Sequence, residues 1–256
     1  MIYNTDEQLT GAAKLLYQPN DNWSFHMGQD IYTPKTKTTL TPIVGERPYN
    51  AWLYAGLTYQ EEADTIDTLF SLTLDLGTRG PRALGEEVQN GIHKAGGFPI
   101  VEGWGSQTKD EYGNIFTFTM EKSLANILID SRKELTHLSA YLKTQNGTLL
   151  NTYSVGISTA FGYNTPYYNT EIAFPEDNTF YLFGNFQLIF VDENRFLEGN
   201  TGYNVIRERY LRRYDIGVNW DIKNVRLRLT ATTMSQEFTT QSKNHRFGVV
   251  EIIVGF

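Results

Sequence analysis

The chain of 256 residues lacks three features that would each identify a class of protein. It contains no cysteine, which excludes disulfide bonds and thiolate metal sites. Its formal net charge is −7 rather than positive, so a basic face that follows a nucleic-acid backbone is not expected. No window approaches the roughly 18 continuous apolar residues of a membrane-spanning helix. A soluble domain and a membrane β-barrel both fit this composition, because a barrel places half of every strand in a watery interior.

Apolar and polar residues alternate along many segments, as they do in a sheet with lipid on one side and water on the other. The clearest segment sets Tyr214, Ile216, Val218, Trp220 and Ile222 against Asp215, Gly217, Asn219 and Asp221. Segments 225–232, 70–76 and 154–161 repeat the pattern. The inward set includes Asp215, Arg226 and Arg228, and charges are far less costly in a wet lumen than in a packed core. The pattern therefore favours an antiparallel transmembrane β-barrel over a soluble β-sandwich, which stays as an alternative.

Eleven strands are expected in one domain that spans 1–256. They lie near 9–17, 22–33, 49–60, 65–77, 113–125, 132–144, 147–162, 178–192, 206–222, 223–239 and 245–256. Bacterial single-chain barrels have an even number of strands, so the odd number suggests that one strand is missing. No secretory signal precedes the first strand. The last strand alternates and ends on Phe256, similar to the C-terminal strands of outer-membrane proteins.

Residues 78–112 break the alternation and carry the densest polar chemistry. Within them, GPRALGEEVQNGIHKAGG (80–97) has an early Pro81 and a final Gly96-Gly97, which predicts a short helix near 82–95. Gln89 and His93 are four residues apart and would share one face of that helix. An imidazole is well suited to accept a proton from water near neutral pH. His93 is thus a candidate general base, although a histidine on a loop helix is more often incidental.

Two further strings, GQDIYTP (28–34) and GERPYNAWLY (45–54), flank a loop that contains Lys35 and Lys37. Asp30, Glu46 and Arg47 near the strand ends could form a buried ionic network. The two lysines could instead contact a lipid phosphate, since ammonium groups are adequate partners for phosphate.

Together these strings resemble the outer-membrane lipid A 3′-O-deacylase family. The likeness rests on GQDIYTP, GERPYNAWLY and GPRALGEEVQNGIH in this order and spacing, and it is closest over roughly 10–113. It implies a twelve-stranded barrel in the bacterial outer membrane that removes the 3′-linked acyloxyacyl chain of lipid A, with calcium as cofactor. Lipid A or lipopolysaccharide would be the partner, and a monomer is expected.

The resemblance also implies roles for single residues. The family's general base falls on His93, its active-site Gln on Gln89 and its active-site Thr on Thr10, within TDEQLTG (5–11). Calcium would polarise the ester carbonyl, with Asp6 and Asp30 as candidate ligands. Lys35, Lys37 and Arg47 are the candidate contacts to the substrate.

The sequence departs from the family at three points. The family's first strand carries an Asn-Asp pair that nothing before Asn4 supplies. A family acid beyond the base falls on Pro99, and a functional lysine falls on Thr39. Two alternatives to the hydrolase therefore stay open: a catalytically impaired barrel of this family that binds lipid, and a passive outer-membrane pore.

Overall fold

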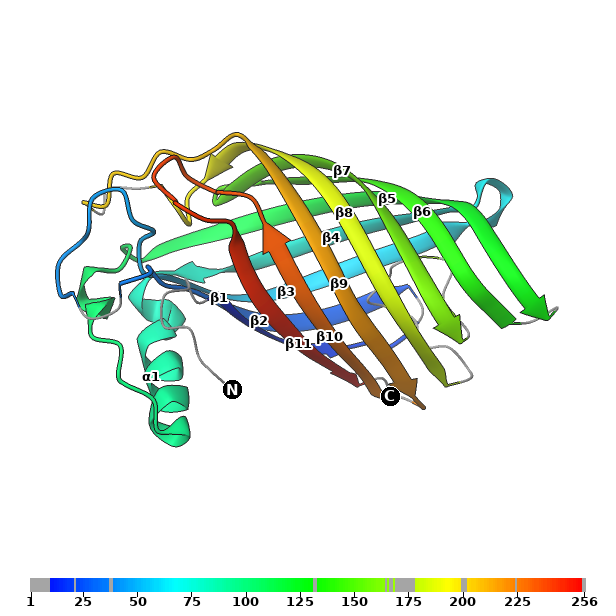
Figure 1. Cartoon of the computed structure of the whole chain (residues 1–256), viewed down its shortest axis with the longest axis horizontal. Helices are drawn as coiled ribbons and strands as arrows, with labels where there is room; N and C mark the ends of the chain where they lie inside the picture. The colour runs from blue at the N-terminus through cyan, green and yellow to red at the C-terminus, as the bar shows by residue number, and fades with distance from the viewer. Residues whose placement is uncertain are drawn as a thin grey trace.

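The computed structural model describes residues 10–20, 22–36, 39–130, 133–163, 165, 168, 178–198, 202–223 and 225–254. Eleven antiparallel strands follow one another in chain order in a single sheet that curls into a nearly closed cylinder (Figure 1). β1 and β11 lie next to each other at the seam. No helix within the described ranges is long and apolar enough to cross a bilayer. The all-β class and the eleven expected strands are confirmed, whereas a missing first strand stays a prediction.

The strands and helices have the following bounds. The strands are β1 (Thr10–Tyr17), β2 (Trp23–Tyr32), β3 (Asn50–Ala63), β4 (Thr68–Arg79), β5 (Glu111–Asp130), β6 (Lys133–Gly147), β7 (Leu150–Tyr163), β8 (Thr179–Asn194), β9 (Tyr210–Ile222), β10 (Val225–Met234) and β11 (His245–Val254). Within the described ranges the α-helix is α1 (Gly85–Gly96), and 3-10 turns occur at η1 (Asp64–Ile66), η2 (Pro81–Ala83) and η3 (Gly103–Ser106). α1 begins three residues later than expected because η2 occupies Pro81–Ala83 and Leu84 adopts a left-handed backbone.

The wall has the polarity that the alternation predicts. On β4, Leu72, Leu74 and Leu76 are exposed on the outside, while Ser71, Thr73 and Asp75 line the interior cavity. The other strands repeat this arrangement, so large apolar side chains face outward and polar ones inward. A soluble sandwich would show the reverse, because it buries its apolar face between two sheets. The outward apolar surface is the one that a bilayer would cover.

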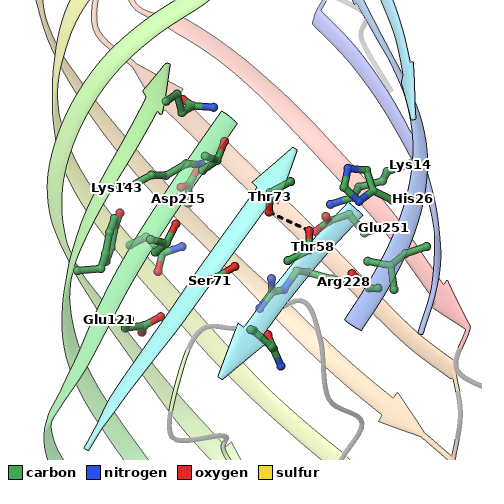
Figure 2. Close-up of a pocket in the computed structure, with 18 of the residues that line it drawn as sticks. Lys14, His26, Thr58, Ser71, Thr73, Glu121, Lys143, Asp215, Arg228 and Glu251 are labelled. Carbon is green, nitrogen blue, oxygen red and sulfur yellow. Dashed lines mark hydrogen bonds between the residues drawn. The ribbon is translucent and has the colours of Figure 1, made fainter. Parts of the chain in front are cut away.

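The interior is a wet, charged cavity of about 410 Å³. Figure 2 shows polar side chains from strands around the barrel directed into it, among them Lys14, His26 and Glu121. His26 Nε2 lies 2.6 Å from Asp75 Oδ1, and the hydroxyls of Thr58 and Thr73 are 2.8 Å apart. Side chains of the lumen thus satisfy part of each other's hydrogen-bonding capacity.

The tight turn between β9 and β10 carries a buried ion pair at one end of the lumen. Arg226 Nε and Nη2 donate to the two oxygens of Asp221 at 2.6 and 3.1 Å, and Thr179 Oγ1 donates to Asp221 Oδ2 at 2.6 Å. Both charged side chains are buried. A buried pair of this kind is costly to break, because removing one partner leaves an uncompensated charge.

Replacing this carboxylate should destabilise the barrel strongly. We expect Asp221→Ala to lower the free energy of unfolding by about 3–5 kcal/mol, since Arg226 would stay buried and unpaired. Urea titration of the refolded protein in detergent, followed by tryptophan fluorescence, measures the change. Asp64→Ala in the exposed η1 turn is the control and should cost about 0.5 kcal/mol or less. Equal small effects of the two substitutions would contradict the assignment.

Candidate active site

The helix α1 is attached to the outer side of the barrel wall. On β2 the outward residues Phe25 and Met27 are exposed, but Ile31, farther along the same face, is buried. Ile31 belongs to a packed cluster with Tyr49, Ala51, Ala83, Val101, Trp104 and Tyr203. Gln29 Nε2 on the same outward face donates to the Ala83 carbonyl at 2.6 Å. The segment around α1 therefore covers the end of the outer wall at β2 and β3.

Local backbone conformation directs α1 away from the wall. Gly80 has a φ of 90° and Leu84 a φ of 57°, so the chain turns sharply twice before the helix begins. A Cβ on Gly85 would lie 2.5 Å from Ala51 Cβ, so only glycine permits this close approach to β3. At the other end Gly97 has a φ of 70° and Phe98 N donates to the His93 carbonyl at 2.8 Å, as in a left-handed C-terminal cap.

Gln89 occupies the buried face of α1. Its exposed fraction is 5%, and its Oε1 accepts a hydrogen bond of 2.8 Å from Trp104 Nε1. An indole N–H can only donate, so the oxygen of the amide must face Trp104 and the NH₂ group must point the other way. Gln89 Nε2 is buried and has no partner within the described part of the chain. The side chain thus holds an oriented, buried donor whose hydrogen-bonding capacity is unused.

His93 lies one helical turn farther along and is half-buried. Its Nδ1 lies 2.6 Å from the carbonyl oxygen of Pro99, and its ring contacts Phe98 edge to face at 5.9 Å. The carbonyl oxygen can only accept, so Nδ1 donates and the neutral imidazole keeps its lone pair on Nε2. The backbone carbonyl of Pro99 thus orients the ring.

The structure therefore brings Gln89 and His93 together on one face of α1, as their spacing predicts. Chemically this face offers a proton acceptor on an oriented imidazole and a neutral amide donor one turn away. Thr10 opens β1 opposite Tyr32 of β2, next to the part of the wall that carries α1. Lys35 is exposed just beyond the end of β2. Lys37 and Asp6 lie outside the described residues.

Arg47 lies inside a buried network rather than at the surface. Its exposed fraction is 1%, its Nη2 donates to Glu237 Oε2 at 2.5 Å, and its guanidinium lies 5.0 Å from the centre of the Tyr32 ring. His245 Nδ1 lies 3.0 Å from the same Glu237 oxygen. Burial by itself would raise the pKa of the Glu237 carboxyl, but Arg47 and His245 outweigh burial and hold this pKa at about 2. Of the residues expected in a buried ionic network, Arg47 is thus in one, and its acid is Glu237, which the sequence reasoning did not name.

Asp30 does not lie with Gln89 and His93. The alternation of β2 sets it on the same face as Ser24 and His26, which line the lumen, whereas α1 lies on the outer side. Within the part of the chain that the structure describes, no three His, Asp or Glu side chains gather as a metal site. Calcium requires about six to eight oxygen ligands. The described residues therefore do not fit a calcium site by themselves, and calcium stays a prediction.

Comparison with known proteins agrees with the barrel fold. Residues 4–256 match the family described as outer membrane protein LpxR. The chain belongs to the LpxR family. Among solved structures, LpxR from Salmonella typhimurium matches with a TM-score of 0.84 and 24% sequence identity, over 95% of this chain and 87% of that one. A search of curated proteins gave no match.

Membership in the LpxR family confirms the resemblance and the outer-membrane location expected from the sequence. The structural match shows that the fold is that of the LpxR barrel. Together they support a barrel of the lipid A deacylase type. Sequence reasoning did not find Trp104 as the partner of Gln89 or Glu237 as the partner of Arg47. The string EGWGSQ (102–107) contains the tryptophan, but nothing in its spacing indicates the contact.

The hydrogen bond between Trp104 and Gln89 should position α1 on the wall. Trp104→Phe removes the indole N–H and leaves the buried amide oxygen of Gln89 without a hydrogen-bond donor, which should cost about 1–3 kcal/mol of stability. Gln89→Met with Trp104→Phe removes both partners and should cost less than the sum of the two single changes. A double-mutant cycle, with hydrogen exchange of the α1 amides as the readout, measures this. Additive costs would contradict the contact.

The Glu237 network should give the loop between β10 and β11 an acid-sensitive stability. A carboxyl whose folded pKa of about 2 lies below its ordinary value of 4.5 stabilises the fold fully above pH 4.5. That contribution is lost as the pH falls from 4.5 toward 2. Limited proteolysis of the 235–244 loop across this range should show increasing cleavage. Glu237→Gln should cleave readily even at neutral pH, and a variant as resistant as the parent would contradict the role.

Proposed function

We propose that this protein is an esterase that removes the 3′-linked acyloxyacyl chain from lipid A in the outer leaflet. The observation that carries the proposal is the oriented imidazole of His93, on a helix outside the wall. Pro99 holds the ring through Nδ1, which leaves the lone pair of Nε2 able to accept a proton. A lipid reaches this side of the barrel by lateral diffusion, without entering the lumen. Membership in the LpxR family supports the same substrate class.

In the proposed reaction, His93 Nε2 accepts a proton from a water molecule as the water oxygen attacks the ester carbonyl carbon. The resulting tetrahedral intermediate collapses with cleavage of the bond to the sugar 3′-oxygen. The imidazolium returns its proton to that oxygen, which leaves a free 3′-hydroxyl and a free acyloxyacyl acid. Hydrolysis by water requires no serine nucleophile, and the sequence contains no Gly-x-Ser-x-Gly motif.

Gln89 and Thr10 are assigned supporting roles. The free NH₂ donor of Gln89 would hold the attacking water or the developing oxyanion, and donors of this kind contribute substantially to acyl transfer. The Thr10 hydroxyl would hydrogen bond near the reacting ester. Lys35 and Lys37 would contact the phosphate of the headgroup. Arg47 is buried against Glu237, so its contribution to the substrate would pass through the loops that it holds in place.

A passive pore receives less support from the lumen. Buried ion pairs lie near both ends, Arg226 with Asp221 at one and Arg47 with Glu237 at the other. An open channel would expose such groups to water. A lipid-binding barrel without activity differs from the hydrolase only in the chemistry at His93, so the measurement below separates the two.

Replacing the proposed base should abolish the reaction without unfolding the barrel. We expect His93→Asn to lower the deacylation rate by about 10²–10⁴-fold, since general base catalysis contributes that much. Mass spectrometry of lipid A incubated with the purified protein measures the loss of the acyloxyacyl group. Glu87→Ala, at an exposed position on the same helix, should retain the rate of the parent.

Two results would count against the proposal. A His93→Asn variant that cleaves lipid A as fast as the parent would remove the assigned base. A parent protein that binds lipid A but releases no acid would favour the lipid-binding alternative. In both cases, a difference in gel migration between heated and unheated samples shows that the barrel is folded.

A further inference from the structure

A stripe of exposed apolar side chains runs along α1. Val88 and Ile92 are four residues apart and lie on one face of the helix, and Leu84, the residue at its N-terminal cap, stands four residues before Val88. All three are exposed, and the exposed fraction of Ile92 reaches 63%. Phe98, also exposed, extends the stripe past the C-terminal end of the helix. Exposed apolar side chains in such a row require a partner that is itself apolar.

The other side of α1 is polar. Glu86, Glu87 and Lys94 are exposed, and Asn90 hydrogen bonds through its side chain to both backbone groups of Val101. An exposed apolar stripe opposite charged residues is the pattern of a helix that lies in the surface of a membrane. Such a helix places its apolar side about 5–10 Å into the boundary between headgroups and acyl chains.

The stripe continues the lipid-facing surface of the barrel. The base of α1 covers Ile31 and Ala51 on the outer wall, and Met27 on the same face of β2 is exposed. Figure 1 shows α1 leaving the end of the barrel and running across the direction of the strands, not along it. The helix therefore extends over the region where the outer surface of the membrane meets the wall.

A polar and aromatic contact marks the level of this surface. Arg82, two residues before the stripe, donates from Nη1 to the hydroxyl of Tyr112 at 2.9 Å, and its backbone N–H donates to Asp110 Oδ1 at 2.8 Å. Tyr112 is exposed on the outside of β5. Tyrosine is enriched where barrels cross from lipid to water, so Leu84 begins at that boundary.

We propose that Leu84, Val88, Ile92 and Phe98 anchor α1 in the outer leaflet by contacting lipid acyl chains. Lipid is the occupant that fits, because the stripe is continuous with the bilayer-facing wall and lies beside its aromatic boundary. The anchor also acts on the site already described. Phe98 contacts the ring of His93 and Ile92 adjoins it in sequence, so the membrane would hold the imidazole at the depth of lipid ester groups.

Site-directed fluorescence tests this anchor, and the absence of native cysteine makes any single introduced cysteine a unique label. Ile92→Cys and Val88→Cys report on the stripe. Lys94→Cys is the matched control, because a residue two positions from Ile92 lies on nearly the opposite side of the helix. The full chain is labelled with a small environment-sensitive fluorophore in phosphatidylcholine nanodiscs. One set of discs carries lipid with a nitroxide near the headgroup end of its acyl chain.

The anchor predicts opposite results for the two sides of the helix. Labels at positions 92 and 88 should emit at shorter wavelength and lose fluorescence with nitroxide lipid, while the label at 94 should be quenched by iodide in water. Equal access of iodide to all three positions would overturn the proposal. Labels at 92 and 88 protected from both quenchers would also overturn it, because another protein segment would then cover the stripe. The discs contain no lipid A, so neither outcome depends on hydrolysis.

Discussion

The requirement that every backbone polar group be paired inside a lipid bilayer governs this structure. Strands meet that requirement by hydrogen bonding to their neighbours, and the eleven strands pair in chain order from β1 to β11, whose edges lie next to each other at the seam. Once the wall has formed, each position on a strand faces either lipid or the lumen. Leu72 and Asp75 on β4 illustrate the result, with one side chain outside and the other in the cavity.

The wall separates two groups of polar residues, one in the lumen and one outside it, that the sequence alone does not distinguish. Asp30 and His26 belong to the lumen, while Gln89 and His93 stand outside it on α1. Only the second group is accessible to a lipid that moves in the membrane plane. Within the lumen, His26 contacts Asp75 and Arg226 pairs with Asp221. The chemistry proposed for this LpxR family member is therefore confined to the end of the wall. There, strand pairing no longer sets the direction in which each side chain points.

The candidate site depends on backbone groups as much as on side chains. The carbonyl of Pro99 sets which nitrogen of His93 carries the proton, and the left-handed residues Leu84 and Gly97 bound the helix. Trp104 fixes the amide of Gln89 from a separate 3-10 turn. The same turns leave the stripe of Leu84, Val88 and Ile92 uncovered. Orientation of the imidazole and exposure of the stripe are thus two results of one local fold.

Sequence alone determined the strands, their inward and outward faces, and the shared face of Gln89 and His93. These follow from periods of two and of about four residues, which act over short distances along the chain. Tertiary structure decided which polar residues meet. Arg47 pairs with Glu237 across 190 positions, and Gln89 with Trp104 across 15, because the closure of the barrel and the loop turns bring them together. Sequence periodicity cannot predict such contacts, since they depend on the paths of loops whose lengths and turns vary independently.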